Sequence, residues 1–175
     1  DGRLWVGAEA GLFQLVDGAL RPAGGRLPQE GVLGLLIDAH GVLWADLSTG
    51  LFRRPPGADF ERVGEPGRSF GANLLADAQG RIWTHRSMVD PATRVVTEFG
   101  RIDGVDIGTG WFRAYGKLAD GRMLFGGSTG LLVVEPERFR RWAFRPPVVA
   151  TGLRIDGVSQ PAGTLSEGLT LTAHQ

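Results

Sequence analysis

Few residues in this sequence have the types and the spacing that catalysis or metal binding requires. Its three histidines lie far apart and form neither a His-x-x-x-His nor a His-Glu-x-x-His pattern: they are His40, His85 and His174. Cysteine is absent, and so is the Gly-x-Ser-x-Gly motif that would activate a serine. The sequence therefore predicts no catalytic residue, no metal and no cofactor.

Aspartate recurs at the start of a turn, in an Asp-Gly or Asp-x-x-Gly pattern, at Asp1, Asp38, Asp77 and Asp120. The side chain of a turn aspartate accepts hydrogen bonds from the backbone that follows it, and glycine tolerates a positive φ. We therefore expect these carboxylates to hold turns rather than to act as catalytic acids or bases.

The aspartate turn belongs to a unit that recurs about every 40 residues. An apolar run follows each turn, with Trp5, Trp44, Trp83 and Leu124 at the same place in successive units. Another run precedes the turn, and a third and a weaker fourth run follow it. Four short strands in a unit of this length are typical of a β-propeller blade. We expect the recurring tryptophans to pack between neighbouring blades as core residues.

The sequence thus predicts an all-β fold, with about four β-propeller blades followed by the first strands of a second β domain. The blades are expected at about residues 1–23, 32–63, 72–99 and 111–144. In the third blade, residues 85–91 replace the second glycine turn, so we expect that blade to be distorted there. Arg145-Pro146-Pro147 interrupts the pattern, and proline cannot donate to a strand ladder. We therefore place a domain boundary there, with the second domain at 145–175.

The composition is that of an ordinary globular protein. Hydrophobic residues make up 42% and charged residues 22%, and the formal net charge is zero, so no nucleic-acid partner or anionic membrane surface is expected. No apolar run approaches the ~20 residues of a membrane span, and there is no signal peptide. Because the sequence begins at a turn inside a blade and ends in an unpaired run at 169–172, we expect a piece of a longer protein.

The fourth unit and the segment after it resemble the two-component-regulator propeller family. Residues 117–127, 130–131 and 135–139 are similar to the final blade of that family. The segment 145–157 resembles the start of the immunoglobulin-like three-tyrosine domain that follows such propellers. The earlier Asp-x-x-Gly-x-Leu-Trp and Gly-Leu-Phe elements match the family's propeller repeat.

The resemblance implies a periplasmic, extracytoplasmic sensory region of a bacterial inner-membrane protein. In that family a transmembrane helix leads to a cytoplasmic histidine kinase, hybrid two-component or diguanylate cyclase output. It also implies a small-molecule or glycan ligand, no enzymatic activity in this segment, and a homodimer in the full-length protein. Two alternatives stay open, namely a scaffold propeller that binds another protein and a glycan-cleaving propeller hydrolase or lyase.

Candidate ligand-binding residues follow from the predicted topology. The aspartate turns lie on one face of a propeller, so the other turns and the loops between blades share the opposite face. Departures from a repeat often mark function, and we therefore favour His85 and Arg86 in the irregular third blade, then Asp103, Asp106 and Trp111 after it. The alternative interpretation is that these are ordinary solvated loop residues.

Overall fold

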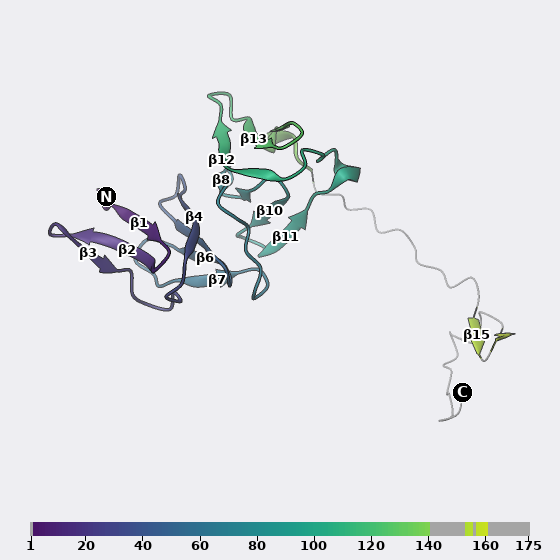
Figure 1. The fold of residues 1–175 in the computed structure, drawn as a ribbon, viewed down its shortest axis with the longest axis horizontal. Helices are drawn as coiled ribbons and strands as arrows, with labels where there is room; N and C mark the ends of the chain where they lie inside the picture. Colours follow the sequence, from purple (N-terminus) through teal and green to yellow (C-terminus); the bar gives the residue numbers. More distant parts are fainter. Residues whose placement is uncertain (1, 141–152, 156, 161–175) are drawn as a thin grey trace. The chain divides into compact units, whose positions relative to one another are not determined.

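A computed structural model describes residues 2–140, 153–155 and 157–160, and the chain divides into two compact units, Asp1–Phe139 and Arg140–Gln175 (Figure 1). The described residues of the first unit form four antiparallel sheets, one after another along the chain. Those of the second unit form one hairpin of β15 (Leu153–Ile155) and β16 (Val158–Gln160). The predicted all-β fold is confirmed. The predicted boundary near residue 145 lies outside the described residues.

The first two sheets are simple meanders. The first sheet contains β1 (Trp5–Ala8), β2 (Gly11–Val16) and β3 (Ala19–Pro22). The second contains β4 (Val32–Ile37), β5 (Leu43–Leu47), β6 (Gly50–Arg54) and β7 (Glu61–Val63). Neighbouring strands are consecutive in the sequence, which is the strand order of a propeller blade.

The third sheet keeps four strands, β8 (Leu75–Ala76), β9 (Ile82–Trp83), β10 (Ser87–Asp90) and β11 (Val95–Glu98). The expected distortion is limited to the shortness of β8 and β9, which have 2 residues each. The turn before β10 closes without glycine. Thr84 N donates to Ser87 O at 2.9 Å, and the Thr84 hydroxyl accepts from Ser87 N at 3.0 Å. A threonine-centred turn therefore replaces the glycine turn, and the third strand is retained.

The fourth sheet contains β12 (Gly110–Lys117), β13 (Met123–Gly127) and β14 (Leu131–Val134). A short 3₁₀ helix, η2 (Pro136–Arg138), follows β14, and another, η1 (Arg101–Asp103), lies in the loop before β12. The pairing of β12 with β13 shifts register between Gly110 and Tyr115, and Arg113 adopts a φ of 61°. The first half of β12 is therefore bulged. Residues 141–144 of the predicted fourth blade lie outside the described residues.

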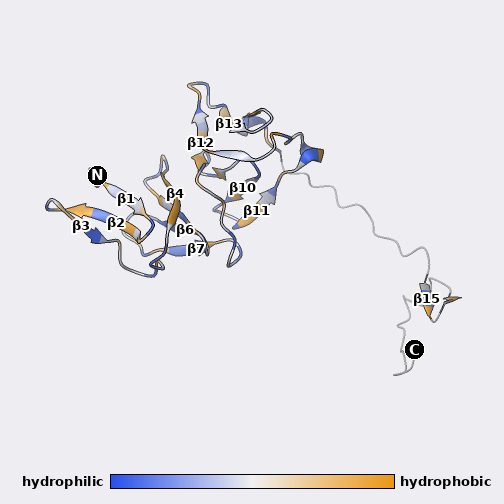
Figure 2. Ribbon diagram, viewed as in Figure 1, coloured by the Kyte–Doolittle hydropathy of each residue, from blue (hydrophilic) through white to orange (hydrophobic). Residues whose placement is uncertain are grey.

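The apolar core lies between neighbouring sheets, and hydrophobic residues occur on strands of all four (Figure 2). Trp44 is 1% exposed and packs in a cluster with Ile82 of the third sheet. Trp83 is 2% exposed and packs in a cluster with Phe125 of the fourth. The prediction that the recurring tryptophans pack between blades is confirmed for these two. Trp5 is half-buried and packs against the cluster between the first and second sheets.

The recurring aspartates Asp38 and Asp77 hold their turns as predicted, and both also bind tryptophan. Asp38 Oδ1 accepts two backbone N–H groups of its own turn, at 2.9 and 3.0 Å, and its Oδ2 accepts Trp44 Nε1 at 2.9 Å. Asp77 repeats the arrangement, with Trp83 Nε1 at 2.7 Å. Each turn is thereby fixed to the tryptophan that fills the next interface between sheets.

Candidate ligand-binding site

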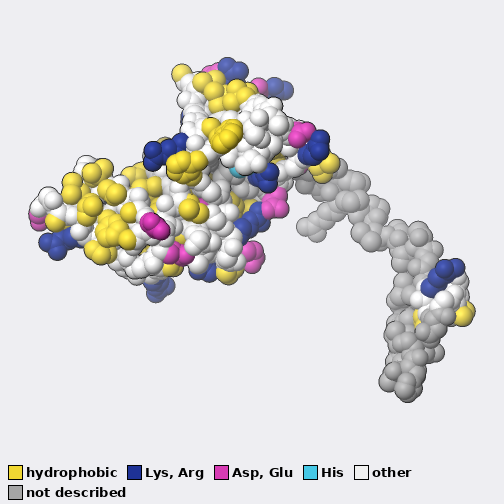
Figure 3. Space-filling model, viewed as in Figure 1, with side chains coloured by type: hydrophobic (Ala, Val, Ile, Leu, Met, Phe, Trp, Pro, Cys, Tyr) yellow, Lys and Arg dark blue, Asp and Glu magenta, His cyan; other side chains and the backbone are white. Residues whose placement is uncertain are grey.

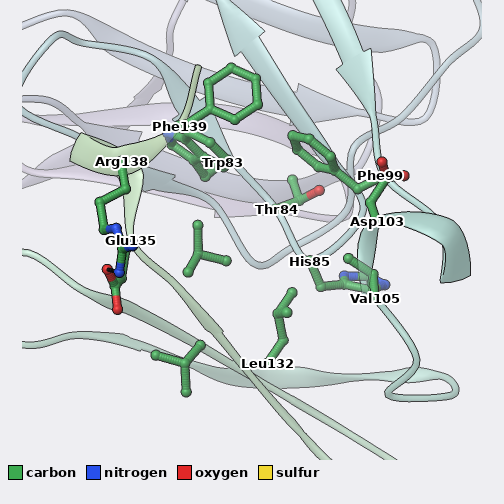
Figure 4. A pocket seen from close by; sticks show the side chains of 12 residues that line it. Trp83, Thr84, His85, Phe99, Asp103, Val105, Leu132, Glu135, Arg138 and Phe139 are labelled. Carbon is green, nitrogen blue, oxygen red and sulfur yellow. Dashed lines mark hydrogen bonds and ion pairs between the residues drawn. The ribbon is translucent and has the colours of Figure 1, made fainter. Parts of the chain in front are cut away.

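A cavity of about 290 Å³ lies between the third and fourth sheets, within the first unit (Figure 4). Its lining comes from the turn after β9, the segment around η1, β14 and the segment around η2. The lining residues are Trp83, Thr84, His85, Phe99, Asp103, Val105, Leu132, Val133, Val134, Glu135, Arg138 and Phe139. A largely apolar lining with a few polar groups is typical of sites for small molecules.

Three aromatic rings stand together in this lining. Trp83 stacks on Phe99 with 5.8 Å between centroids and an interplanar angle of 3°. Phe139 meets Trp83 edge-on at 5.3 Å and Phe99 at 5.8 Å. Both geometries are favoured between aromatic rings, so the three side chains hold one another in place. Because Phe99 follows β11 and Phe139 follows η2, the contact joins separate parts of the chain.

His85 lines the cavity from the turn between β9 and β10. Burial lowers the pKa of its imidazole below the ordinary 6.5, and the charge of Arg86 lowers it further, so the surroundings favour the neutral form of the ring. Its ring packs against Gly110 at the start of β12, where a Cβ would lie 2.8 Å from a ring carbon of His85. Glycine at position 110 therefore makes room for the histidine.

Two carboxylates lie on opposite sides of the cavity in Figure 4. Oδ2 of Asp103 accepts the backbone N–H of Gly100 at 2.9 Å. Glu135 lies on the other side and pairs with Arg138, with 3.0 Å between Oε2 and Nη1. Within residues 2–140, no lysine or arginine side chain pairs with Asp103. Glu135 thus has a cationic partner, and Asp103, which is exposed, has none within residues 2–140.

The structure brings together two of the five predicted ligand-binding residues, His85 and Asp103, which both line this cavity. The other three lie elsewhere. Arg86 reaches towards the loop before β12, with Nη2 3.5 Å from a backbone carbonyl oxygen. Asp106 pairs with an arginine of η1 at 2.9 Å. Trp111 lies on β12 and is 61% exposed. A ligand-binding role for these three stays a prediction.

An aromatic surface on β12 is separate from the cavity. Trp111 and Phe112 are exposed, and Figure 3 shows hydrophobic side chains gathered on the surface of the fourth sheet. Asn73 is buried and holds the bulge beneath them. Its Nδ2 donates to the Trp111 carbonyl at 2.7 Å, and its Oδ1 accepts Arg113 N at 2.9 Å. The sequence did not identify Asn73, because an asparagine before a strand has no distinguishing pattern.

Arg81 ties η2 to the aspartate turn of the third sheet. Its Nε pairs with Asp77 Oδ2 at 2.5 Å, and its Nη2 donates to Pro136 O at 2.8 Å. The guanidinium group lies 5.4 Å from the ring centroid of Trp83 and 5.6 Å from that of Phe139. We call this set of contacts the Arg81 clasp. The sequence could not reveal it, because Arg81 and Pro136 are far apart in the chain.

Asp46 is a second buried polar residue, on the predicted ligand face but outside the five favoured ligand-binding residues. It occupies the position in β5 that His85 occupies after β9, two residues beyond the recurring tryptophan. It accepts Ser69 Oγ at 2.6 Å and the backbone N–H groups of Phe70 and Gly71 at 3.0 and 2.7 Å. Asp46 contacts the segment before the third sheet, and His85 contacts Gly110 at the start of the fourth sheet. His85 therefore also has a packing role.

Among residues 2–140, 153–155 and 157–160, no three His, Cys, Asp or Glu side chains form a group that could hold a metal ion. No helix in the same part of the chain is both long enough and apolar enough to cross a membrane.

Comparison with known proteins gives a likeness in fold. No protein-family model matches the chain, and no curated protein matches it. Among solved structures, the extracellular domain of BT4673 from B. thetaiotaomicron, described as a one-component system, gives a TM-score of 0.51 and 20% identity over 76% of this chain and 20% of that chain. Another structure of that extracellular domain, described as a hybrid two-component system, gives a TM-score of 0.41 and 14% identity over 78% of this chain and 28% of that chain. The chain therefore spans about a fifth of the length of the first structure and shares its fold.

Proposed function

We propose that this chain belongs to the extracytoplasmic sensory region of a bacterial membrane signalling protein and that it binds a ligand without transforming it. The observation that carries the proposal is the likeness in fold to the extracellular domain of BT4673, with a TM-score of 0.51 over 76% of the chain. The recurring Asp-x-x-Gly-x-Leu-Trp units, which resemble those of the two-component-regulator propeller family, support the same function.

The cavity between the third and fourth sheets supports binding rather than catalysis. Its two carboxylates already have partners in the protein, Asp103 a backbone N–H group and Glu135 the side chain of Arg138. Covalent catalysis needs a nucleophile within hydrogen-bond reach of a base. The hydroxyl of Thr84 instead lies 2.9 Å from that of Ser87. Groups held in this way can recognise a ligand by shape and charge.

The position of the cavity indicates how the effect of ligand binding would be transmitted to the rest of the protein. Residues of η2 and Phe139 line it, and the chain passes directly from Phe139 into the second unit. In our proposal, ligand binding changes the packing of η2 and, through it, the second unit and the dimer of the full-length protein. A kinase, hybrid or diguanylate cyclase output on the cytoplasmic side would receive this change.

The first test is the sequence of the gene on both sides of this chain. We expect further Asp-x-x-Gly-x-Leu-Trp units before residue 1. After residue 175 we expect the rest of a β domain, an apolar span of ~20 residues and a kinase or cyclase domain. A gene that ends shortly after residue 175, with no such span anywhere, would contradict the proposal.

A protein-binding scaffold is a second candidate, and the aromatic surface on β12 favours it. Trp111 and Phe112 are 61% and 70% exposed, and the guanidinium group of Arg113 lies 5.3 Å from the ring centroid of Phe112. Exposed aromatic rings beside an arginine are typical of protein interfaces. The test is the pair of substitutions Trp111→Ser and Phe112→Ser in the full-length protein. Loss of a co-purifying protein with an unchanged signalling response would support the scaffold, and an unchanged set of partners would exclude it.

A further inference from the structure

We propose that the cavity between the third and fourth sheets binds a small organic amine, with its apolar body against the aromatic rings and its ammonium group beside Asp103. This inference rests on the proposed sensory function and names the chemical class of the ligand. It follows from the size of the cavity, the aromatic rings and the charges around it.

The size and the apolar lining of the cavity determine how large and how apolar the main part of the ligand can be. A volume of about 290 Å³ lies at the lower end of the range for small-molecule sites, so a ligand with one ring fits better than a larger molecule. Phe99 and Phe139 are half-buried and supply aromatic surface, whereas Trp83 is buried. Val105, Leu132, Val133 and Val134 add to the apolar lining. An aromatic or alicyclic ring would lose its contact with water there without leaving a polar group unpaired.

The charged side chains around the cavity determine which charge the polar group of the ligand should carry. Asp103 lines the same cavity as Phe99 and is exposed, and within residues 2–140 no lysine or arginine side chain forms an ion pair with it. A carboxylate attracts an organic cation by direct charge attraction, and an aromatic ring attracts it through the negative face of the ring. An ammonium group at Asp103 would supply the cationic partner that this carboxylate does not have among residues 2–140.

An anionic ligand is disfavoured by the same groups. Arg138 is the one cationic side chain of the lining, and it is already paired with Glu135 at 3.0 Å. Burial lowers the pKa of the His85 imidazole and so disfavours its charged form. The lining residues include two carboxylates and one guanidinium group, and the guanidinium group of Arg81 lies over the rings of Trp83 and Phe139 without being part of the lining. A carboxylate ligand would face Asp103, which has no cationic partner within residues 2–140.

The test compares three probes with one skeleton and different charge, namely 2-phenylethylamine, 2-phenylethanol and phenylacetate, titrated into the full chain by calorimetry. We expect saturable binding of the amine, binding of the alcohol about tenfold weaker, and no measurable binding of the acid, since one exposed charge contact is worth about that factor. Equal binding of the three probes, preference for the acid, or absence of binding by all of them would overturn the proposal.

Variants identify the site. Asp103→Asn keeps the shape of the side chain and removes its charge, so the amine should fall to the affinity of the alcohol while the alcohol is unchanged. Asp120→Asn is the matched control, because Asp120 is exposed, pairs with Arg122 and does not line this cavity. Leu132→Trp should fill the cavity and abolish binding of both probes. An amine preference that survives Asp103→Asn would also overturn the proposal.

These outcomes are distinct from those that bear on the sensory function. If no probe binds while the gene encodes a membrane span and an output domain, the sensory function stands and the amine site is rejected. If the amine binds but the gene encodes no span and no output domain, the binding site stands and the sensory function is rejected.

Discussion

The carboxylates of Asp38 and Asp77 each accept an indole N–H group in addition to backbone N–H groups of their own turns. Both aspartates are buried, with 9% and 3% of their surface exposed. A buried donor that loses its acceptor costs about 1–3 kcal/mol. One residue type thus fixes a turn and at the same time orients a ring in the core between sheets.

We expect Asp77→Ala to lower the free energy of unfolding by about 2–4 kcal/mol, because Trp83 Nε1 and the guanidinium group of Arg81 lose a buried acceptor. Urea denaturation followed by tryptophan fluorescence measures the change. Asp120→Ala is the control, since Asp120 occupies the corresponding turn of the fourth sheet but is exposed. It should leave the unfolding free energy nearly unchanged, and equal losses in the two variants would contradict this account.

The buried carboxyl group of Asp46 should make the free energy of unfolding depend on pH. Burial raises the pKa of its carboxyl above the ordinary 3.8, although hydrogen bonds from Ser69, Phe70 and Gly71 oppose the rise. The folded protein therefore binds this proton more tightly than the unfolded protein does. The contribution of Asp46 to the unfolding free energy is then highest below pH 3.8 and falls as the pH rises through the folded pKa.

The corresponding measurement is urea denaturation of the wild type and Asp46→Asn at a series of pH values. We expect the wild type to lose stability relative to the variant as the pH rises above 3.8. Asp120→Asn should show the opposite sign, because the backbone N–H group of Arg122 lowers the pKa of Asp120. A difference between the wild type and Asp46→Asn that does not vary with pH would count against this assignment.

At the scale of elements, η2 is held by contacts with the third sheet. The Arg81 clasp binds the carbonyl of Pro136, and Gln79 Nε2 donates to Glu137 Oε2 at 2.9 Å. A helix as short as η2 has little stability of its own. Its position is therefore set by the third sheet as much as by β14, which precedes it.

We expect Arg81→Lys to loosen η2, because the ammonium group of lysine cannot pair with Asp77, reach Pro136 O and lie over two rings at once. Limited trypsin digestion should then cleave after Arg138 about 5 to 30 times faster than in the wild type, which corresponds to a loss of about 1–2 kcal/mol in local stability. Arg122→Lys keeps the number of trypsin sites and serves as control. An unchanged cleavage rate in Arg81→Lys would contradict a role for the clasp.

The elements differ in how well the sequence predicts them. β5 (Leu43–Leu47) and β6 (Gly50–Arg54) are predictable because an apolar run adjoins a glycine turn in each. For β10 the sequence predicts a distorted strand, since the usual glycine turn before it is missing. The structure keeps the strand, because hydrogen bonds of Thr84 close that turn, and such bonds leave no recognisable pattern in a sequence. In the cavity, His85 and Asp103 were predicted from the irregular turn and loop. Leu132 and Phe139 were not, because their part in the lining depends on how the fourth sheet packs against the third.

At the scale of the first unit, stability comes from interfaces between neighbouring sheets. The three clusters of buried residues each join adjacent sheets, so the energetics should follow the nearest-neighbour behaviour of repeat proteins. Exposed hydrophobic side chains occur on the first, second and fourth sheets, among them Leu20 at 53%, Ile37 at 53% and Leu131 at 60%. Figure 3 shows hydrophobic side chains on the surface of the first unit. The interface between the second and third sheets is the middle one of the three, so its loss would separate two sheets from the other two.

We expect Leu51→Ala to lower the unfolding free energy by about 2–5 kcal/mol, because Leu51 is 0% exposed in the cluster between the second and third sheets. Amide hydrogen exchange should speed up in β5, β6, β9 and β10 together. Leu15→Ala in the first sheet is the control, since Leu15 is 39% exposed and should change little. Faster exchange confined to the second sheet would contradict coupling across the interface.

The contacts of Phe139 and Pro136 also determine how the first unit would carry mechanical load. Tension applied through the second unit enters the first at Phe139, the last residue before the division. That ring contacts Trp83 and Phe99, and the carbonyl of Pro136, at the start of η2, accepts a hydrogen bond from Arg81. All three contacts are made with the third sheet and its flanking segments. A pull on the chain would therefore be shared between the third sheet and β14 instead of peeling β14 from β13 one hydrogen bond at a time.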